Sequence, residues 1–175
     1  ELIGYTSLIP LAVPYRLLRA THMQHHSHTN DPIMDPDYST KAKNFKNAIW
    51  INFFINTSGN NLYKDFVENL EDSQENKRTI FESLLTNISY WTILIIFVWL
   101  GFGLEVACIW WIPRLIALGY VRMTLSWAPH HPMEEQGRYR NTRGFKAKIG
   151  TILTMGMEYH IIHHLHPSIP LNLSL

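Results

Sequence analysis

The distribution of charged residues constrains the fold of this chain more than any other feature. Between Ile88 and Trp127 the charged residues are Glu105, Arg114 and Arg122, whereas the remainder of the 175 residues holds the other 26 of 29 charged side chains. A long stretch with so little charge is typical of a protein that spans a bilayer, because charged groups are costly in hydrocarbon. The sequence therefore predicts an all-α integral membrane helical protein.

The apolar stretch divides into two candidate spans with a tight turn between them. Residues 88–104 are 17 uncharged residues, which reach roughly 26 Å as a helix, and residues 106–127 are 22 residues long. Gly101 and Gly103 suit the turn. We therefore expect a transmembrane hairpin over residues 88–127, in which Arg114 either extends toward the interface or joins a buried ion pair.

The remaining segments predict a single domain over residues 1–175. Residues 1–14 read as the tail of a span, 15–87 as a cytoplasmic segment, 88–127 as the hairpin and 128–175 as a second cytoplasmic segment. Residues 41–78 hold six Lys and Arg and residues 138–148 hold five, which the positive-inside rule places in the cytoplasm. Because the chain starts at Glu1 within an apolar run, we expect a fragment of a multi-pass protein, truncated at both ends.

Composition excludes several classes of function. The net charge is +1 and no block of like charge occurs, so nothing argues for nucleic acid as a partner. The single cysteine, Cys108, excludes a disulfide framework and a cysteine-ligated zinc or iron–sulfur centre.

All ten histidines fall in three short windows, which is the strongest indication of chemistry in the sequence. The windows are His22, His25, His26 and His28; His130 and His131; and His160, His163, His164 and His166. The first three residues of the first window, and of the third, have the spacing i, i+3 and i+4, which places each triplet on one face of a helix where it can converge on a metal. Two successive spans would return the chain to the side it left, so we expect all three windows on the cytoplasmic side.

The number of imidazoles suggests two metal ions in nitrogen-rich coordination, where iron fits as well as zinc or copper. A zinc protease is excluded, because Met23, Gln24 and His25 stand between His22 and His26, where the His-Glu-x-x-His motif requires a glutamate directly after its first histidine. His28 and His166 suit exposed surface positions as well as they suit a role behind the metal ligands. A metal beside a bilayer favours oxidation of a lipid-like substrate with dioxygen, since side chains alone cannot oxidise an unactivated C–H bond.

These motifs resemble the histidine boxes of the membrane fatty-acid desaturase and hydroxylase superfamily. His22-x-x-His25-His26 followed by Asn30-Asp31-Pro32 and Asp35-Pro36-Asp37 resembles its second box, and Tyr159-His160-Ile-Ile-His163-His164 resembles its third. Pro129-His130-His131-Pro132, with the arginine-rich run to Arg143, is similar to bacterial desaturase-like or carotenoid-modifying members. The first box is missing, so we expect it to precede Glu1 and the fragment alone to bind iron poorly and to be inactive.

The resemblance implies a di-iron enzyme that uses dioxygen and two electrons from a ferredoxin, rubredoxin or cytochrome. The implied iron ligands are His22, His25, His26, His160, His163 and His164, together with one of His130 and His131. Four carboxylates are candidates for orienting these imidazoles, although turn and surface roles are equally compatible with the sequence: Asp31, Asp35, Asp37 and Glu158. Arg138, Arg140 and Arg143 suit either an acidic electron donor or ordinary positive-inside charge.

The favoured activity is desaturation of a long-chain fatty acyl substrate. Within the same superfamily, a carotenoid hydroxylase or ketolase and an alkane hydroxylase are alternatives, which product analysis would separate. A membrane metal-binding or metal-transport protein is the alternative from another class, but it predicts histidines or carboxylates inside the spans. A purely structural membrane anchor would leave both histidine triplets unexplained.

Overall fold

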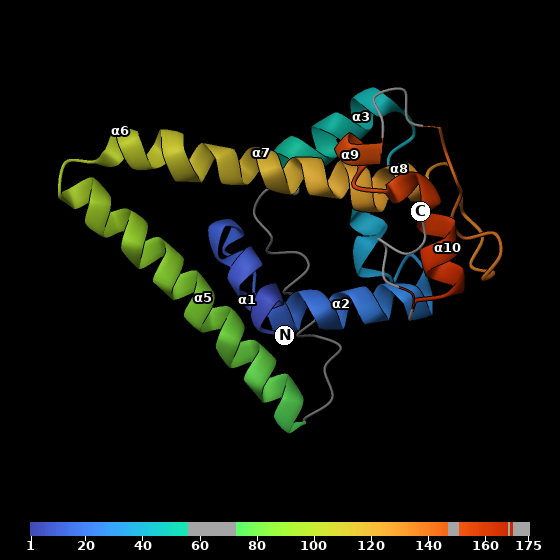
Figure 1. The fold of residues 1–175 in the computed structure, drawn as a ribbon, viewed down its shortest axis with the longest axis horizontal. Coiled ribbons are helices and arrows are strands. Elements are labelled where there is room, and N and C mark those ends of the chain that lie inside the picture. The colour runs from blue at the N-terminus through green and yellow to red at the C-terminus, as the bar shows by residue number, and fades with distance from the viewer. Residues whose placement is uncertain (56–72, 147–150, 168, 170–175) are drawn as a thin grey trace. The chain divides into compact units, whose positions relative to one another are not determined.

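The computed structural model describes residues 1–55, 73–146, 151–167 and 169, and every regular element within these ranges is a helix (Figure 1). The chain divides into two compact units, one of residues 1–23 and 58–118 and the other of residues 24–57 and 119–175. We refer to them as unit 1 and unit 2. The prediction of an all-α protein is confirmed for the described residues.

Unit 1 holds the long apolar helices. Its elements are α1 (Leu2–Leu8), the 3₁₀ helix η1 (Ile9–Leu11), the start of α2 (Tyr15–His28), α5 (Gln74–Trp99), α6 (Gly103–Val106), the π-helix η5 (Ala107–Trp111) and most of α7 (Ile112–Val121). Ser73 caps the start of α5, where its side chain accepts a hydrogen bond from the main-chain N–H of Asn76.

The turn between α5 and α6 depends on a glycine. Gly101 has a φ of 91°, in the left-handed region that residues with a Cβ avoid. Around it, the N–H of Phe102 donates to the carbonyl of Phe97 and that of Gly101 to Val98, the paired bonds of a Schellman motif. The tight turn that the sequence predicts thus ends α5 and allows α6 to begin at Gly103 (Figure 1).

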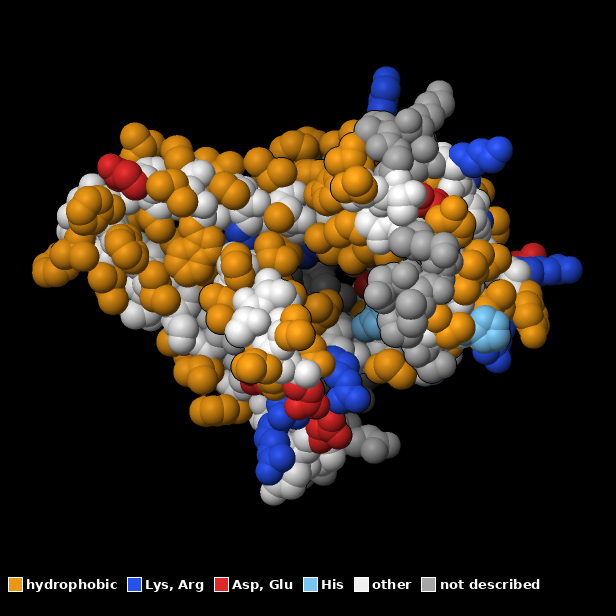
Figure 2. All heavy atoms as spheres, viewed as in Figure 1, with side chains coloured by type: hydrophobic (Ala, Val, Ile, Leu, Met, Phe, Trp, Pro, Cys, Tyr) orange, Lys and Arg blue, Asp and Glu red, His pale blue; other side chains and the backbone are white. Residues whose placement is uncertain are grey.

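Two helices are long and apolar enough to cross a membrane, and their apolar side chains are mostly exposed. These helices are Gln74–Trp99 and Gly103–His130; only 17% and 6%, respectively, of their most apolar windows is buried. Figure 2 shows hydrophobic side chains along α5 and along the α6–α7 helix. The core helix of a soluble protein would bury its apolar side chains, so this exposure supports a membrane protein.

A small core ties the start of the chain to both long helices within unit 1. Ala12, Tyr90 and Leu94 are buried together, with Trp110 packed against them. The indole N–H of Trp110 donates to the carbonyl of Pro10 at 2.7 Å.

Arg114 binds this core rather than an acidic partner. Its Nε donates to the carbonyl of Leu11 at 2.6 Å, and its guanidinium lies 4.6 Å from the ring centre of Tyr90. Neither the outward extension nor the ion pair expected from the sequence is seen among the described residues. The Leu11 carbonyl and the Tyr90 ring stabilise the positive charge of Arg114 instead.

Unit 2 is built from short helices. It contains the end of α2, the 3₁₀ helix η2 (Pro36–Thr40), α3 (Phe45–Trp50), the π-helix η3 (Ile51–Ile55), the last residues of α7, the π-helix η6 (Arg122–Trp127), α8 (Ala128–His130), α9 (Thr151–Thr154), the 3₁₀ helix η7 (Met157–Tyr159) and α10 (His160–Leu165).

Two close contacts join the helices of unit 2. Asn52 is fully buried, and its Nδ2 donates to the carbonyls of Thr40 and Ala48. Gly119 lies so close to Phe53 that a Cβ there would be 2.4 Å from the ring carbon Cδ1. Only a glycine permits this approach without movement of the ring, so α7 and η3 are held at short range.

Candidate metal centre

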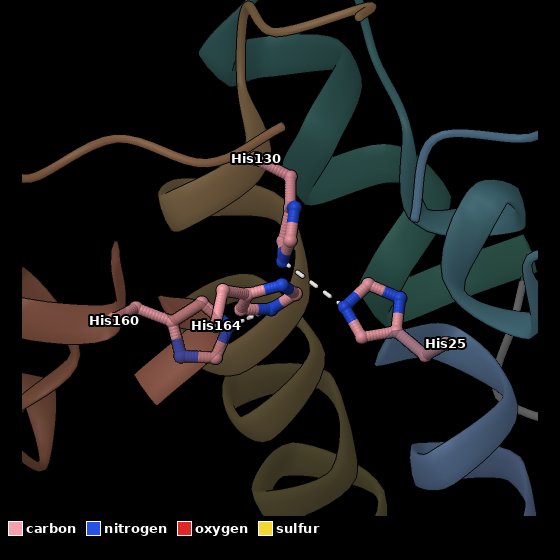
Figure 3. Close-up of side chains that lie close together, drawn as sticks. All are labelled: His25, His130, His160 and His164. Atoms are coloured by element: carbon pink, nitrogen blue, oxygen red, sulfur yellow. Dashed lines mark hydrogen bonds between the residues drawn. The ribbon is translucent and has the colours of Figure 1, made fainter. Parts of the chain in front are cut away.

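Four buried histidines from three helices of unit 2 meet in one group. His25 comes from α2, His130 from the end of α8, and His160 and His164 from α10 (Figure 3). Each offers a ring nitrogen, and these four nitrogens all lie within 4.8 Å of one another. The group therefore brings His25 together with three histidines that follow it by more than 100 residues in the sequence.

The ring nitrogens are paired at distances that suit a shared metal ion. The Nε2 atoms of His25 and His130 are 3.2 Å apart, and those of His160 and His164 are 3.0 Å apart (Figure 3). Two nitrogens bound at about 2.1 Å to one metal are about 3.0 Å apart at a right angle and about 3.4 Å apart at a tetrahedral angle. Both observed separations fall within this range.

Hydrogen bonds on the far side of two rings turn their Nε2 atoms toward the centre. The Nδ1 of His25 faces Asp35 Oδ1 at 2.7 Å, and the Nδ1 of His130 faces the main-chain carbonyl of Asn141 at 3.1 Å. Because both partners are acceptors, each Nδ1 carries the proton, and the neutral ring has its lone pair on Nε2. Two lone pairs that face each other repel, so a cation between them would stabilise the arrangement.

Burial also favours the protonation state that binds metal. The pKa of His160 and of His164 lies well below its ordinary value, because burial disfavours the imidazolium and the neighbouring histidines repel a charge. Burial acts the same way on His25, but the hydrogen bond to Asp35 and the charge of Asp37 outweigh it and raise the pKa of His25. Neutral imidazole is the ligand form, so the cluster fits a divalent transition metal.

A second, less buried pair lies next to this group. The Nε2 atoms of His26 and His163 are 2.9 Å apart, and the rings of His26 and His164 are 4.3 Å apart between centres. His22 is one turn before His26 on the same face of the continuous helix α2. His26 and His163 are therefore the candidates for a second metal site within unit 2, and His22 is the residue of α2 that shares the direction of His26.

The structure distributes each histidine triplet between the two groups instead of directing it at one ion. Successive helical residues are about 100° apart, so His25 and His26 point in different directions, whereas His22 and His26 differ by about 40°. His163 and His164 on α10 are also consecutive, so they too point in directions about 100° apart.

The two neighbouring histidines at the end of the second long helix have different surroundings. The structure brings His130 into the four-histidine group, whereas His131 stacks on Trp127 with ring centres 4.8 Å apart. His28 and His166, the remaining histidines, are exposed, in keeping with surface positions.

Of the four candidate carboxylates, Asp35 is the one hydrogen-bonded to a histidine ring in the described part of the chain. Asp37 Oδ2 lies 3.9 Å from the Nδ1 of His25 and accepts a hydrogen bond from Ser126 of η6. Asp31 caps a turn by accepting from the main-chain N–H groups of Ile33 and Met34.

The remaining carboxylate, Glu158, accepts hydrogen bonds from the hydroxyls of Thr151 and Thr154, which lower its pKa. These bonds connect α9 to η7, immediately before α10. Glu158 therefore stabilises the local fold next to the histidines of α10 and is bonded to threonines rather than to an imidazole.

Two of the arginines after His131 donate hydrogen bonds to main-chain carbonyls. Arg138 donates to the carbonyl of Leu165 at the end of α10, and Arg143 Nε lies 3.4 Å from the carbonyl of Ala128 in α8. Arg140 forms an exposed ion pair with Glu135. The segment of residues 135–143 thus connects the helices that carry His130 and the histidines of α10.

Sequence reasoning missed two residues close to the cluster. Asn141 acts through its main-chain carbonyl, which leaves no signature in residue type. Asn30 is buried with a φ of 68° and donates to the carbonyls of Glu135 and Asn141. An asparagine two residues after a helix end is a recognisable signal for the left-handed conformation, although its partners are distant in sequence.

A cavity of about 400 Å³ reaches the cluster from within unit 2. The residues that line it include His25, His130, Lys41, Trp127 and Pro132. The two buried histidines are therefore accessible to a small molecule.

Comparison with known proteins gives a match over nearly the whole chain. The family model described as Fatty acid desaturase matches residues 1–173. Neither the curated proteins nor the solved structures give a match.

Proposed function

The chain belongs to the fatty acid desaturase family, and on this premise we propose that it is a membrane enzyme that uses iron and dioxygen to desaturate a long-chain fatty acyl substrate. Family membership supports an oxidoreductase of the desaturase type, and this family uses iron. The observation that carries the proposal is the buried four-histidine group, whose nitrogen donors are spaced for a metal ion.

We propose that the two histidine groups hold two iron ions. His25, His130, His160 and His164 would bind the first, and His22, His26 and His163 would contribute to the second. When bound, the irons supply the oxidation of a C–H bond with dioxygen and two electrons, chemistry that amino-acid side chains lack. A ferredoxin, rubredoxin or cytochrome is the expected class of electron donor.

The chain's own residues prepare this site in three ways. Burial keeps His160 and His164 neutral and ready to bind metal. Asp35 and the carbonyl of Asn141 hold the protons of His25 and His130 on Nδ1, so the lone pair of each Nε2 is directed at the metal position. The exposed apolar surfaces of the two long helices suit a bilayer, where a hydrocarbon substrate dissolves. By the positive-inside rule, we place the histidines at the cytoplasmic side of a multi-pass protein.

The metal content of the purified protein tests the proposal first. We expect about two irons per chain in the full-length protein, purified anaerobically, since the donor set is rich in nitrogen and almost free of thiolate. His164→Ala should lose the first iron, whereas the matched variant His28→Ala, which removes an exposed histidine outside both groups, should keep both. Stoichiometric zinc, or no metal in the unmodified protein, would contradict the proposal.

Product analysis separates desaturation from the alternatives. Cells that express the protein are compared with cells that express His164→Ala, and their fatty acids, carotenoids and alkanes are analysed by mass spectrometry. A new double bond in a fatty acyl chain is the expected product. A hydroxylated or ketolated carotenoid, or an alkanol, would assign one of the other reactions. Uptake of labelled iron into proteoliposomes, without any product, would favour a metal transporter.

A further inference from the structure

Asn30 connects the supports of two metal-facing histidines through hydrogen bonds of its side chain and main chain. Its Nδ2 donates to the carbonyls of Glu135 and Asn141, at 2.8 and 2.9 Å. Its main-chain N–H donates to Asp35 Oδ2 at 2.7 Å. Because both side-chain partners are carbonyls, the amide can face them only with its NH₂ group.

Two of these three bonds share their acceptor with a histidine. The Asn141 carbonyl that receives Asn30 Nδ2 also accepts from the Nδ1 of His130. The Asp35 carboxylate that receives the main-chain N–H also accepts from the Nδ1 of His25. One residue therefore fixes the acceptor behind both rings, whose Nε2 atoms face each other at 3.2 Å.

Burial and backbone conformation make this arrangement specific. Asn30 and Asn141 are 3% and 5% exposed, so water does not compete for these bonds. The φ of 68° at residue 30 aims the main-chain N–H at Asp35 while the side chain reaches the segment of residues 135–143. Asparagine tolerates this left-handed conformation better than most residues with a side chain.

We propose that Asn30 is a positioning residue that sets the orientation of His25 and His130 together. It acts through its side chain on His130 and through its main chain on His25. The inference deepens the proposed function, since the two rings belong to the proposed first iron site. The arrangement of hydrogen bonds is a property of the metal-free chain, so it can be tested separately from iron binding.

Two substitutions separate the two connections. Asn30→Gly removes the side chain but retains the left-handed backbone and its N–H donor to Asp35, so it should release His130 alone. Asn30→Ala removes the side chain and also disfavours the left-handed backbone, so it should release both rings. Asn44→Gly is the matched control, because Asn44 is an exposed helix cap of α3 outside these contacts.

The readout is modification of each histidine by diethyl pyrocarbonate, mapped by mass spectrometry on the metal-free protein in detergent. Asn30→Gly should raise the rate at His130 at least about fivefold through local opening, and Asn30→Ala should raise it at both His130 and His25. The rates at His160 and His164 should stay within about twofold and so report that the fold is intact. Unchanged rates at His130, or equal increases at all four histidines, would overturn the inference.

Iron affinity, measured by competition with a chelator, provides the second readout. We expect Asn30→Ala to weaken binding about 10- to 100-fold, the usual effect of removing support behind a ligand, and Asn44→Gly to leave it unchanged. An unchanged affinity in Asn30→Ala would overturn the inference. If the unmodified protein binds no iron, the proposed function fails, whereas the modification rates still decide the role of Asn30.

Discussion

Replacement of Asp35 by asparagine gives the sharpest test of how the four-histidine group is supported. Asp35 Oδ1 accepts hydrogen bonds from the Nδ1 of His25 at 2.7 Å and from the main-chain N–H of Asp37 at 2.9 Å. Its Oδ2 accepts from the main-chain N–H of Asn30 at 2.7 Å. All three partners are donors, so the NH₂ of an asparagine meets a donor in either orientation.

The magnitude follows from the less costly orientation. With its oxygen in the Oδ1 position, the amide keeps two bonds and loses the one to Asn30, and a hydrogen bond to a charged group contributes about 1.5–3 kcal/mol. We therefore expect Asp35→Asn to destabilise the metal-free protein by about 2–3 kcal/mol. The Nδ1 proton of His25 keeps its acceptor, so iron affinity should fall only about tenfold, against about 100-fold for Asp35→Ala.

The assay combines thermal unfolding in detergent with chelator competition for iron. Asp31→Asn is the matched control, because Asp31 Oδ1 alone accepts both main-chain bonds of its turn and an asparagine can keep them. It should change iron affinity by less than about threefold, because it supports no ligand. Equal effects of Asp35→Asn and Asp31→Asn, or a larger effect of Asp35→Asn than of Asp35→Ala, would refute this reasoning.

Three further predictions concern pH, packing and the choice of ligand. Burial lowers the pKa of His160 and His164, so as the pH falls the unfolded chain binds protons at these histidines before the folded chain does. The metal-free protein should therefore lose stability below about pH 6.5, and melting temperatures that rise toward pH 5 would contradict this. Gly119→Ala should lower the free energy of unfolding by about 1–3 kcal/mol, because the new methyl group would overlap with Phe53. Adding Phe53→Ala should recover part of that loss in a double-mutant cycle, whereas additive effects would exclude the contact. His131→Ala should retain the iron that His130→Ala loses, as measured by metal analysis, because His131 packs on Trp127 outside the group.

The helical architecture was predictable because its causes are local in sequence. The apolar stretch with three charges predicts long membrane helices, and the glycines at 101 and 103 predict the turn between them. The structure has both features, although α5 begins at Gln74, well before the first apolar residue of the expected span. The Ser73 cap and the polar first turns of α5 form a helix without apolar character, which a search for hydrophobic segments does not detect.

Support for the metal-facing histidines was less predictable, because it depends on contacts between distant segments. The sequence singled out Asp35 as a carboxylate near a histidine box, and the structure places it against His25. Behind His130, the acceptor is the main-chain carbonyl of Asn141, which any residue type would provide. The distinction between His130 and His131 likewise depends on where α8 ends, since consecutive residues at a helix end point in different directions.

Helix geometry explains why a His-x-x-His-His triplet serves two neighbouring sites. At about 100° per residue, positions i and i+4 differ by about 40°, whereas i+3 and i+4 differ by about 100°. Thus His22 and His26 share one direction on α2, and His25 faces the other group. On α10 the pair at i and i+4, His160 and His164, faces the buried group, while His163 faces His26. The triplets therefore alternate between the two groups, and the i, i+4 pair of each helix belongs to a different one. Each of the two helices thus supplies histidines to both groups. A rotation of either helix would therefore displace nitrogen donors of both groups at once.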